Sequence, residues 1–277
     1  MLKTATGFKQ QQSGFTLIEI AVVLVIIGIL VGSFIGAFAD RIETTRRDNT
    51  SKQLEEIRSA ILGFASAQGR LPCPSTTTSI GLEQPVGGGV CTWQHGFVPG
   101  RTLGINGAYN RDNLLIDSWG NPIRYSITTS NLSAFTSPYT VPPPPALPTG
   151  IKGVGMAVLN PNLVVCDGDS TSGTACAGGV NPLIDSAPFI LLSLGKDGSD
   201  FVAAVAPDSD QGENAREAVV AANAGGENLA YTVGNNRVFV SKSYSSVDAA
   251  AGQFDDIIVW ESRYIIYSRM LEAGQLP

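Results

Sequence analysis

The hydrophobic pattern changes in kind along the first quarter of the chain. Residues 15–39 are apolar almost without interruption. From Ile42 onward, apolar residues recur at three- and four-residue spacing between charged ones, which is the pattern of a helix with one buried face. Gly69, followed closely by Pro72, ends this pattern. The sequence therefore predicts one helix over residues 15–68, apolar in its first half and amphipathic in its second.

The apolar run is long enough to cross a membrane. A hydrocarbon core of about 30 Å needs roughly 20 apolar helical residues, so residues 15–39 are predicted to form a transmembrane segment. A secretory signal peptide is one alternative, but its apolar core is shorter and ends at a small-residue cleavage site. Here the apolar run is longer, and the small residue, Gly14, comes before it. A simple membrane anchor is the second alternative, but it does not explain Glu19. Placing a charged side chain inside a bilayer costs at least about 2.5 kcal/mol of free energy, and an anchor gains nothing in return.

The rest of the chain is predicted to be a β-rich head, residues 70–277, with a single core. Short segments rich in β-branched and aromatic residues lie between turn residues, as expected of strands: 122–129, 155–159, 187–194, 237–241 and 254–260. Two further helices are predicted over 213–224 and 261–273. The predicted fold class is α+β, with the long N-terminal helix packed on an antiparallel β-sheet head that carries inserted loops.

Composition narrows the functional classes. The net charge is −6, which argues against a nucleic-acid-binding surface, because such a surface needs clustered Lys and Arg. Only 15% of the residues are charged, and Gly and Pro are abundant, which is typical of a loop-rich domain outside the cytoplasm.

The four cysteines all follow the apolar run: Cys73, Cys91, Cys166 and Cys176. An even number in an oxidising compartment predicts disulfides, with three connectivities open. The sequence-local pairs, 73 with 91 and 166 with 176, are the favoured ones. A zinc site is the alternative, but the chain has no C-x-x-C motif and a single histidine.

The sequence G-F-T-L-I-E at residues 14–19, followed by the apolar run, resembles the N-terminus of the type IV pilin and type II secretion pseudopilin family. Prepilin peptidase cuts members of this family between the glycine and the phenylalanine and methylates the new amine. The resemblance implies a leader peptide of residues 1–14, cleavage between Gly14 and Phe15, N-methylation of Phe15, and a long helix over residues 15–69.

The resemblance also implies how the subunit assembles. After cleavage, the amine of Phe15 is a cation at the head of the helix, and Glu19 neutralises it on the same subunit or on the next one. The precursor would cross the inner membrane once, with its N-terminus in the cytoplasm, and then join other pilins in a periplasmic or surface filament. Gly28, Gly32 and Gly36 place small residues on one helix face, where they allow close helix packing or merely ease packing against lipid.

Three head segments resemble the G-type major pseudopilins of type II secretion. They are D-S-W-G-N-P-I-R-Y at residues 117–125, S-L-G-K-D-G at 193–198, and D-D-I-I-V-W at 255–260. In those proteins the last two segments form a calcium site, and hard cations need six or more oxygen ligands. The resemblance implies as ligands the carbonyl of Leu194, the carboxylate of Asp197, and the carboxylate of either Asp255 or Asp256. Asp200 is a further candidate because it lies close to Asp197 in the sequence. More than fifty residues separate the two segments here, so the insertion could keep the site or abolish it.

Three classes of function follow from these patterns. A structural filament subunit is favoured. Insertions at residues 73–91, 130–186 and 201–251 suit a minor subunit, and the sequence leaves pilus and pseudopilus both open. The alternative is a filament-displayed adhesin that binds through Trp93 and His95. An enzyme is not predicted, because no G-x-S-x-G or phosphate-loop motif accompanies the single histidine.

Overall fold

The computed structural model describes residues 14–168, 175–176, 181–198, 214, 237–245 and 253–277, without the side chains of 33–40 and 197. The chain divides into two compact units, residues 1–45 and residues 46–277. The predicted long helix is confirmed as α1, Leu17–Gln68, which begins in the first unit and continues into the second. Gly69 ends it in the left-handed conformation (φ 71°), with its N–H donating to the carbonyl of Ala65.

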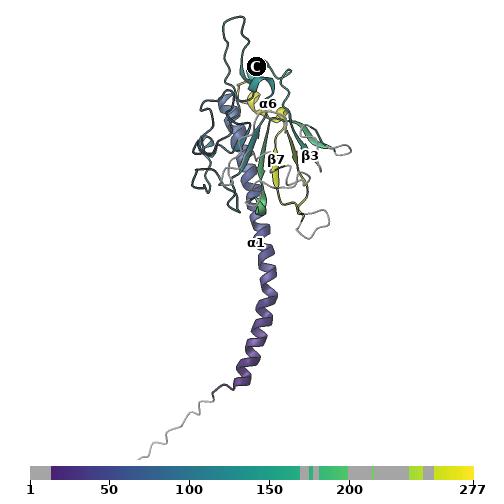
Figure 1. Ribbon diagram of the computed structural model, residues 1–277. Coiled ribbons are helices and arrows are strands. Elements are labelled where there is room, and N and C mark those ends of the chain that lie inside the picture. The colour runs from purple at the N-terminus through teal and green to yellow at the C-terminus, as the bar shows by residue number, and fades with distance from the viewer. Residues whose placement is uncertain (1–13, 169–174, 177–180, 199–213, 215–236, 246–252) are drawn as a thin grey trace, which may run out of the picture. The chain divides into compact units, whose positions relative to one another are not determined.

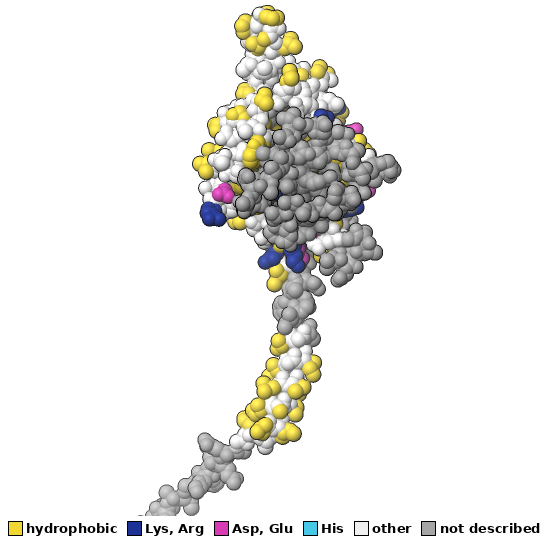
Figure 2. All heavy atoms as spheres, in the orientation of Figure 1, with side chains coloured by type: hydrophobic (Ala, Val, Ile, Leu, Met, Phe, Trp, Pro, Cys, Tyr) yellow, Lys and Arg dark blue, Asp and Glu magenta, His cyan; other side chains and the backbone are white. Residues whose placement is uncertain are grey.

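The first unit contains the apolar part of α1. Large apolar side chains from Phe15 to Val31 are each about half exposed or more, and Figure 2 shows them gathered along this part of the helix. A helix that is apolar on all sides is normally covered by a partner or by lipid. No helix among the described residues has a stretch that is both long and apolar enough to cross a membrane.

The second unit is built on a four-stranded antiparallel sheet. Its strand order is β1 (His95–Phe97), β2 (Arg124–Ile127), β5 (Phe189–Ser193) and β7 (Ile257–Trp260). One face of this sheet packs against the amphipathic half of α1, as predicted. Fully buried side chains from both elements meet in the main core: Leu54, Ile57, Ile61 and Ala65 from α1, and Tyr125, Ile127, Phe189 and Leu191 from the sheet.

A second, three-stranded sheet covers the other face. Its order is β4 (Pro182–Ala187), β3 (Leu163–Cys166) and β6 (Val238–Val240). Alternate side chains of β5 point away from α1 and meet the inner face of this sheet, including Ile190, Leu192, Val165 and Phe239. Because successive strand residues face opposite sides, β5 joins both cores. This unit therefore has three layers, represented by α1, β7 and β3 in Figure 1.

Short helices complete the second unit. They are α2 (Gly100–Leu103), α3 (Ser130–Ser133), α4 (Gly150–Val154), the 3-10 helix η1 (Gly195–Asp197) and α6 (Arg263–Glu272). The last of these confirms the helix predicted over 261–273. Ser262 caps it, because its Oγ accepts from the N–H of Tyr264, and Ile266 and Met270 are buried in the main core.

The strand predictions were partly right. Strands occur within 122–129, 187–194, 237–241 and 254–260, but not at 155–159, where the prediction was wrong. Gly155 has φ 86° and donates to the carbonyl of Ile151, so the chain turns there after α4. Strands β1, β3 and β4 were not predicted, and β3 pairs with β6 in parallel rather than antiparallel. Nearly all of the helix predicted over 213–224 lies outside the described residues.

Both predicted disulfides are present. Cys73 bonds to Cys91 and Cys166 bonds to Cys176, with Cα atoms 5.4 and 5.6 Å apart. The first closes a loop directly after α1. The second lies over the outer face of the three-stranded sheet, where Cys166 packs with Val164 and Val238.

Candidate functional site

The predicted cleavage site lies in an exposed, non-helical segment. Gly14, Phe15 and Thr16 precede the first residue of α1, and Phe15 is 84% exposed. A Cβ atom built on Gly14 would have no atom within 4 Å. The fold of the chain therefore does not require glycine at position 14. If glycine is required there, the requirement comes from a protein that binds this segment.

Glu19 caps the start of α1. Its Oε2 accepts hydrogen bonds from the backbone N–H and the Oγ1 of Thr16, both at 2.8 Å, while the N–H of Glu19 donates to Thr16 Oγ1 at 3.3 Å. This reciprocal arrangement is a capping box, and its T-x-x-E signature was present in the sequence. Glu19 therefore has a local role in helix initiation besides the predicted role in neutralising the amine of Phe15.

The helix glycines leave room for a neighbouring helix. A Cβ atom on Gly28 or Gly32 would have no atom within 4 Å, so this chain alone does not need their small size. Gly36 falls among residues 33–40, whose side chains lie outside the described part. Each glycine inside a helix costs roughly 1 kcal/mol relative to alanine. The roles predicted for these glycines, in close helix packing or in packing against lipid, stay predictions.

The three head motifs converge at one end of the four-stranded sheet. Asp117 Oδ1 accepts from the N–H groups of Trp119 and Asn121, both at 2.9 Å, and its Oδ2 accepts from Ser193 Oγ at 2.6 Å. Asn121 Nδ2 donates to the carbonyl of Gly195 at 2.7 Å. The turn at 117–121 is thus bonded to the end of β5. Burial raises the pKa of Asp117, although these hydrogen bonds partly offset the increase.

The third motif joins at the same place. Asp255 Oδ2 accepts from the N–H of Lys196 at 2.7 Å, and the Asp255 carbonyl accepts from Arg47 Nη1 at 2.9 Å. A Cβ on Gly195 would lie 2.6 Å from the Asp255 carboxylate, so only glycine allows this approach. The long insertion therefore returns the chain to the strand end from which it left.

Asp256 serves a different purpose, as a buried link between the two sheets. Its Oδ2 accepts from Asn214 Nδ2 at 2.7 Å. The same Asn214 amide bonds both backbone groups of Val240 in β6. Burial lowers the pKa of Arg124 to about 9, while the negative charge of Asp256 acts in the opposite direction. Nothing in the sequence around Asn214 indicated this role.

The described residues do not by themselves form a calcium site. Oxygens of Asp255, Asp256 and Gly195 already accept hydrogen bonds from the protein. No group of three or more His, Cys, Asp or Glu residues within the described part could hold a metal ion. The carboxylates of Asp197 and Asp200 lie outside the described residues, so the calcium prediction that involves them and Leu194 stays a prediction.

Of the two head residues that the sequence suggested for binding, His95 is buried and Trp93 is partly buried. His95 is 2% exposed, and its Nδ1 lies 2.8 Å from Ser126 Oγ. Trp93 is half-buried and packs against Phe97 and Leu114. The expectation that Trp93 and His95 form an exposed binding surface is therefore wrong for His95 and unsupported for Trp93.

Comparison with protein-family models matched residues 9–35 to the prokaryotic N-terminal methylation motif. The match covers the exposed cleavage segment, Glu19 and the start of the apolar helix. No curated protein and no solved structure matched the chain.

Proposed function

We propose that this chain, whose N-terminus carries the methylation motif of the type IV pilin and type II secretion pseudopilin family, is a minor structural subunit of such a filament. Proteins of this family are structural rather than enzymatic. The observation that carries the proposal is the exposed G-F-T-L-I-E segment, which leads into a helix whose apolar side chains are unpacked within the chain. Prepilin peptidase, the inner membrane and other pilins are the partners that this arrangement implies.

The three-stranded sheet supports the proposal that this chain is a minor subunit, one present in few copies per filament. Two of its strands, β3 and β4, lie almost wholly within the insertion at 130–186, and β6 lies within the insertion at 201–251. The insertions therefore add a complete layer to the head rather than only loops. A subunit that tiles a whole filament must fit its neighbours at every position, whereas a subunit present in few copies is free to carry such an added layer.

The proposal is tested by mass spectrometry of filaments sheared from the native cell surface, compared with the membrane fraction. We expect a peptide that begins at methylated Phe15, at a low ratio to another subunit. The same peptide found only in the membrane and periplasm would indicate a secretion pseudopilus. A precursor intact at Gly14 in both fractions would contradict the proposal.

The charge of Glu19 is expected to be needed for assembly and not only for helix capping. Glu19→Gln keeps an oxygen that can accept from Thr16, since glutamine is found in capping boxes, but it removes the charge. Glu19→Ala removes both. If the carboxylate neutralises the amine of Phe15, both variants are cleaved normally and both are depleted in sheared filaments, as measured by quantitative mass spectrometry.

Normal incorporation of Glu19→Gln together with loss of Glu19→Ala would show that the cap alone matters. The matched control is Glu56→Gln, which removes one exposed carboxylate from the second half of α1. We expect this variant to be processed and incorporated like the unmodified chain.

Calcium binding at the end of β5 is a separate proposal, supported by the meeting of the 194–197 turn with Asp255. A ligand that binds only the folded state stabilises it by RT ln(1 + [L]/Kd). Calcium should therefore raise the melting temperature of the full chain by several degrees, and EDTA should reverse the rise.

Asp255→Asn keeps an acceptor for the Lys196 N–H but weakens the cation site, so it should lose the calcium response. Asp112→Asn should keep it. An unchanged melting temperature in calcium and EDTA would show that the turn closes without a metal.

A further inference from the structure

The outer face of the three-stranded sheet carries a polar pocket of about 420 Å³. The inner face of this sheet is closed by the four-stranded sheet, so the pocket lies on the side away from the main core. Its volume is within the range of about 300–1,000 Å³ that is typical of small-molecule sites. Neither the methylation motif nor the proposed assembly segment involves any of its residues.

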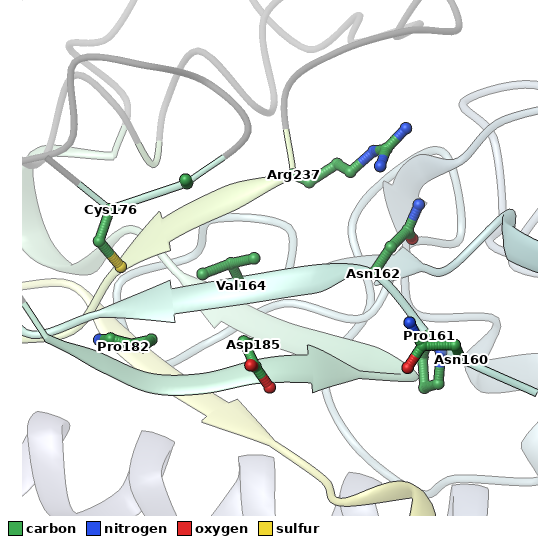
Figure 3. A pocket seen from close by; sticks show the side chains of 9 residues that line it. Asn160, Pro161, Asn162, Val164, Cys176, Pro182, Asp185 and Arg237 are labelled. Atoms are coloured by element: carbon green, nitrogen blue, oxygen red, sulfur yellow. The ribbon is translucent and has the colours of Figure 1, made fainter.

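The pocket has charged and amide groups around an apolar floor (Figure 3). Val164, which is 8% exposed, lies on the central strand β3. Asp185 lies on the flanking strand β4, and Arg237 directly precedes the other flanking strand, β6, as Figure 3 shows. Pro182 and Cys176 line one end, while Asn160, Pro161 and Asn162 line the other.

Hydrogen bonds to neighbouring residues hold the polar groups at the Asn162 end in place. In the amide orientation that satisfies both neighbours, Asn162 donates to Thr128 Oγ1 at 2.6 Å and accepts from Arg237 Nε and Nη1 at 3.2 and 3.1 Å. Asn160 Oδ1 accepts from Arg263 Nη1 at 2.9 Å. Arg237 is therefore fixed along one edge of its guanidinium, and the amide nitrogen of Asn160 is available as a donor. These groups would lose little further rotational freedom on binding a ligand.

Asp185 is the complementary acceptor. Its side chain is exposed, and among the described residues its carboxylate forms no hydrogen bond or ion pair. A carboxylate only accepts hydrogen bonds, whereas a guanidinium only donates them. The pocket thus offers one acceptor-only group and one donor-only group of opposite charge on the two sides of Val164.

We propose that this pocket binds a neutral saccharide. A hydroxyl group both donates and accepts, so adjacent sugar hydroxyls can donate to Asp185 and accept from Arg237 and Asn160. An anionic ligand would be repelled by Asp185 and a cationic one by Arg237, so the mixed charge favours a ligand without net charge, either a polyhydroxyl molecule or a zwitterion. The apolar floor favours the polyhydroxyl molecule, because a sugar ring covers it and a short zwitterion does not. The apolar floor at Val164 and the two proline rings suit the C–H face of a sugar ring. Such a site would give the displayed head a binding function, and it does not depend on filament assembly.

The test uses the full chain in a detergent without a sugar headgroup and saturation-transfer difference NMR. The probes are lactose, maltose and diacetylchitobiose as neutral sugars, sialic acid as an anion and glycylglycine as a zwitterion. We expect saturation transfer to at least one neutral disaccharide and none to the two charged probes. Asp185→Asn and Arg237→Gln should each weaken binding at least about tenfold, because hydrogen bonds to charged groups are the stronger ones.

If Asp185→Asn or Arg237→Gln folds poorly, a variant that fills the pocket with a larger side chain provides a second test. Ala175 is exposed and lines the pocket, so Ala175→Trp should be tolerated and should abolish binding. Glu56→Gln and Arg111→Gln make the same charge changes at exposed positions outside the lining and should leave binding unchanged. Absence of transfer to every neutral sugar would overturn the proposal. Binding that persists in Ala175→Trp would do so too, as would transfer to glycylglycine alone.

Discussion

Replacing Gly14 with valine is expected to leave the chain unprocessed. The segment around Gly14 is exposed and precedes α1, and an added Cβ would have no atom within 4 Å. Valine is therefore expected to leave the fold of the subunit intact. It should instead hinder the peptidase, because the added side chain would lie between the catalytic groups of the peptidase and the Gly14–Phe15 peptide bond. Each 1.36 kcal/mol of lost transition-state stabilisation lowers the rate about tenfold, so a clash of a few kcal/mol should all but abolish cleavage.

Processing of the Gly14→Val variant is measured by the abundance of the peptide that begins at Phe15, relative to a peptide from α6. The matched control is Gly7→Val, the same substitution within the leader, which should be cleaved at the normal rate. Normal cleavage of Gly14→Val would contradict the prediction that prepilin peptidase cuts the chain after Gly14. Loss of cleavage in both variants would instead show that the leader is disturbed as a whole.

The long helix could be predicted because its signals are local. An uninterrupted apolar run, a three- and four-residue repeat and a terminal glycine all lie along one contiguous stretch. The T-x-x-E signature of the Thr16–Glu19 capping box is equally local, but the charge pairing that the family resemblance implies is by itself a sufficient reason for Glu19. A residue in this position can have both roles, and only the geometry of the side chain shows the local one.

The layered head could not be predicted to the same depth. Strand β1 has only three residues, and β3 is buried on both faces, so its apolar side chains do not alternate with polar ones. The parallel pairing of β3 with β6 joins segments that are about seventy residues apart, which no local pattern specifies. The motif resemblance left open whether the insertion brings Asp255 back to the turn at 194–197. The two meet because the turn follows the end of β5 and Asp255 precedes the start of β7, and these strands pair antiparallel.

The link through Asn214 shows why some site residues escape sequence reasoning altogether. One asparagine amide bonds both the N–H and the carbonyl of Val240, as a neighbouring strand would, and it also donates to Asp256. Only the position of this amide beside a sheet edge makes it a structural element, and that position depends on the whole fold.

Removing Glu83 is expected to cause a large loss of stability in the head. Arg70, directly after α1, is 5% exposed and donates to both Glu83 oxygens, Nη2 to Oε1 at 2.7 Å and Nη1 to Oε2 at 2.8 Å. The same carboxylate accepts from the N–H groups of Cys73 and Gly87. Glu83 thus organises the loop that the Cys73–Cys91 disulfide closes. Glu83→Ala would leave the buried Arg70 without a counter-ion, with only a hydrogen bond to the Leu71 carbonyl and a contact over the Phe64 ring.

Breaking a buried ion pair from one side costs about 3–5 kcal/mol, whereas replacing both partners with apolar residues is often close to neutral. We therefore expect Glu83→Ala to destabilise the full chain by that amount in urea unfolding followed by tryptophan fluorescence. The three tryptophans, Trp93, Trp119 and Trp260, all lie in the second unit and report on its unfolding. The double variant Arg70→Met with Glu83→Leu should recover much of the loss.

The control is Glu55→Ala, which removes the exposed partner of Arg58 and leaves the contact between Arg58 and Glu261. An exposed ion pair contributes about 1 kcal/mol or less, so this variant should unfold near the midpoint of the unmodified chain. Equal losses for Glu83→Ala and Glu55→Ala would show that the Arg70–Glu83 pair contributes no more than a surface contact. A large loss that the double variant does not relieve would instead place the cost in the bonds from Glu83 to the Cys73 and Gly87 backbone.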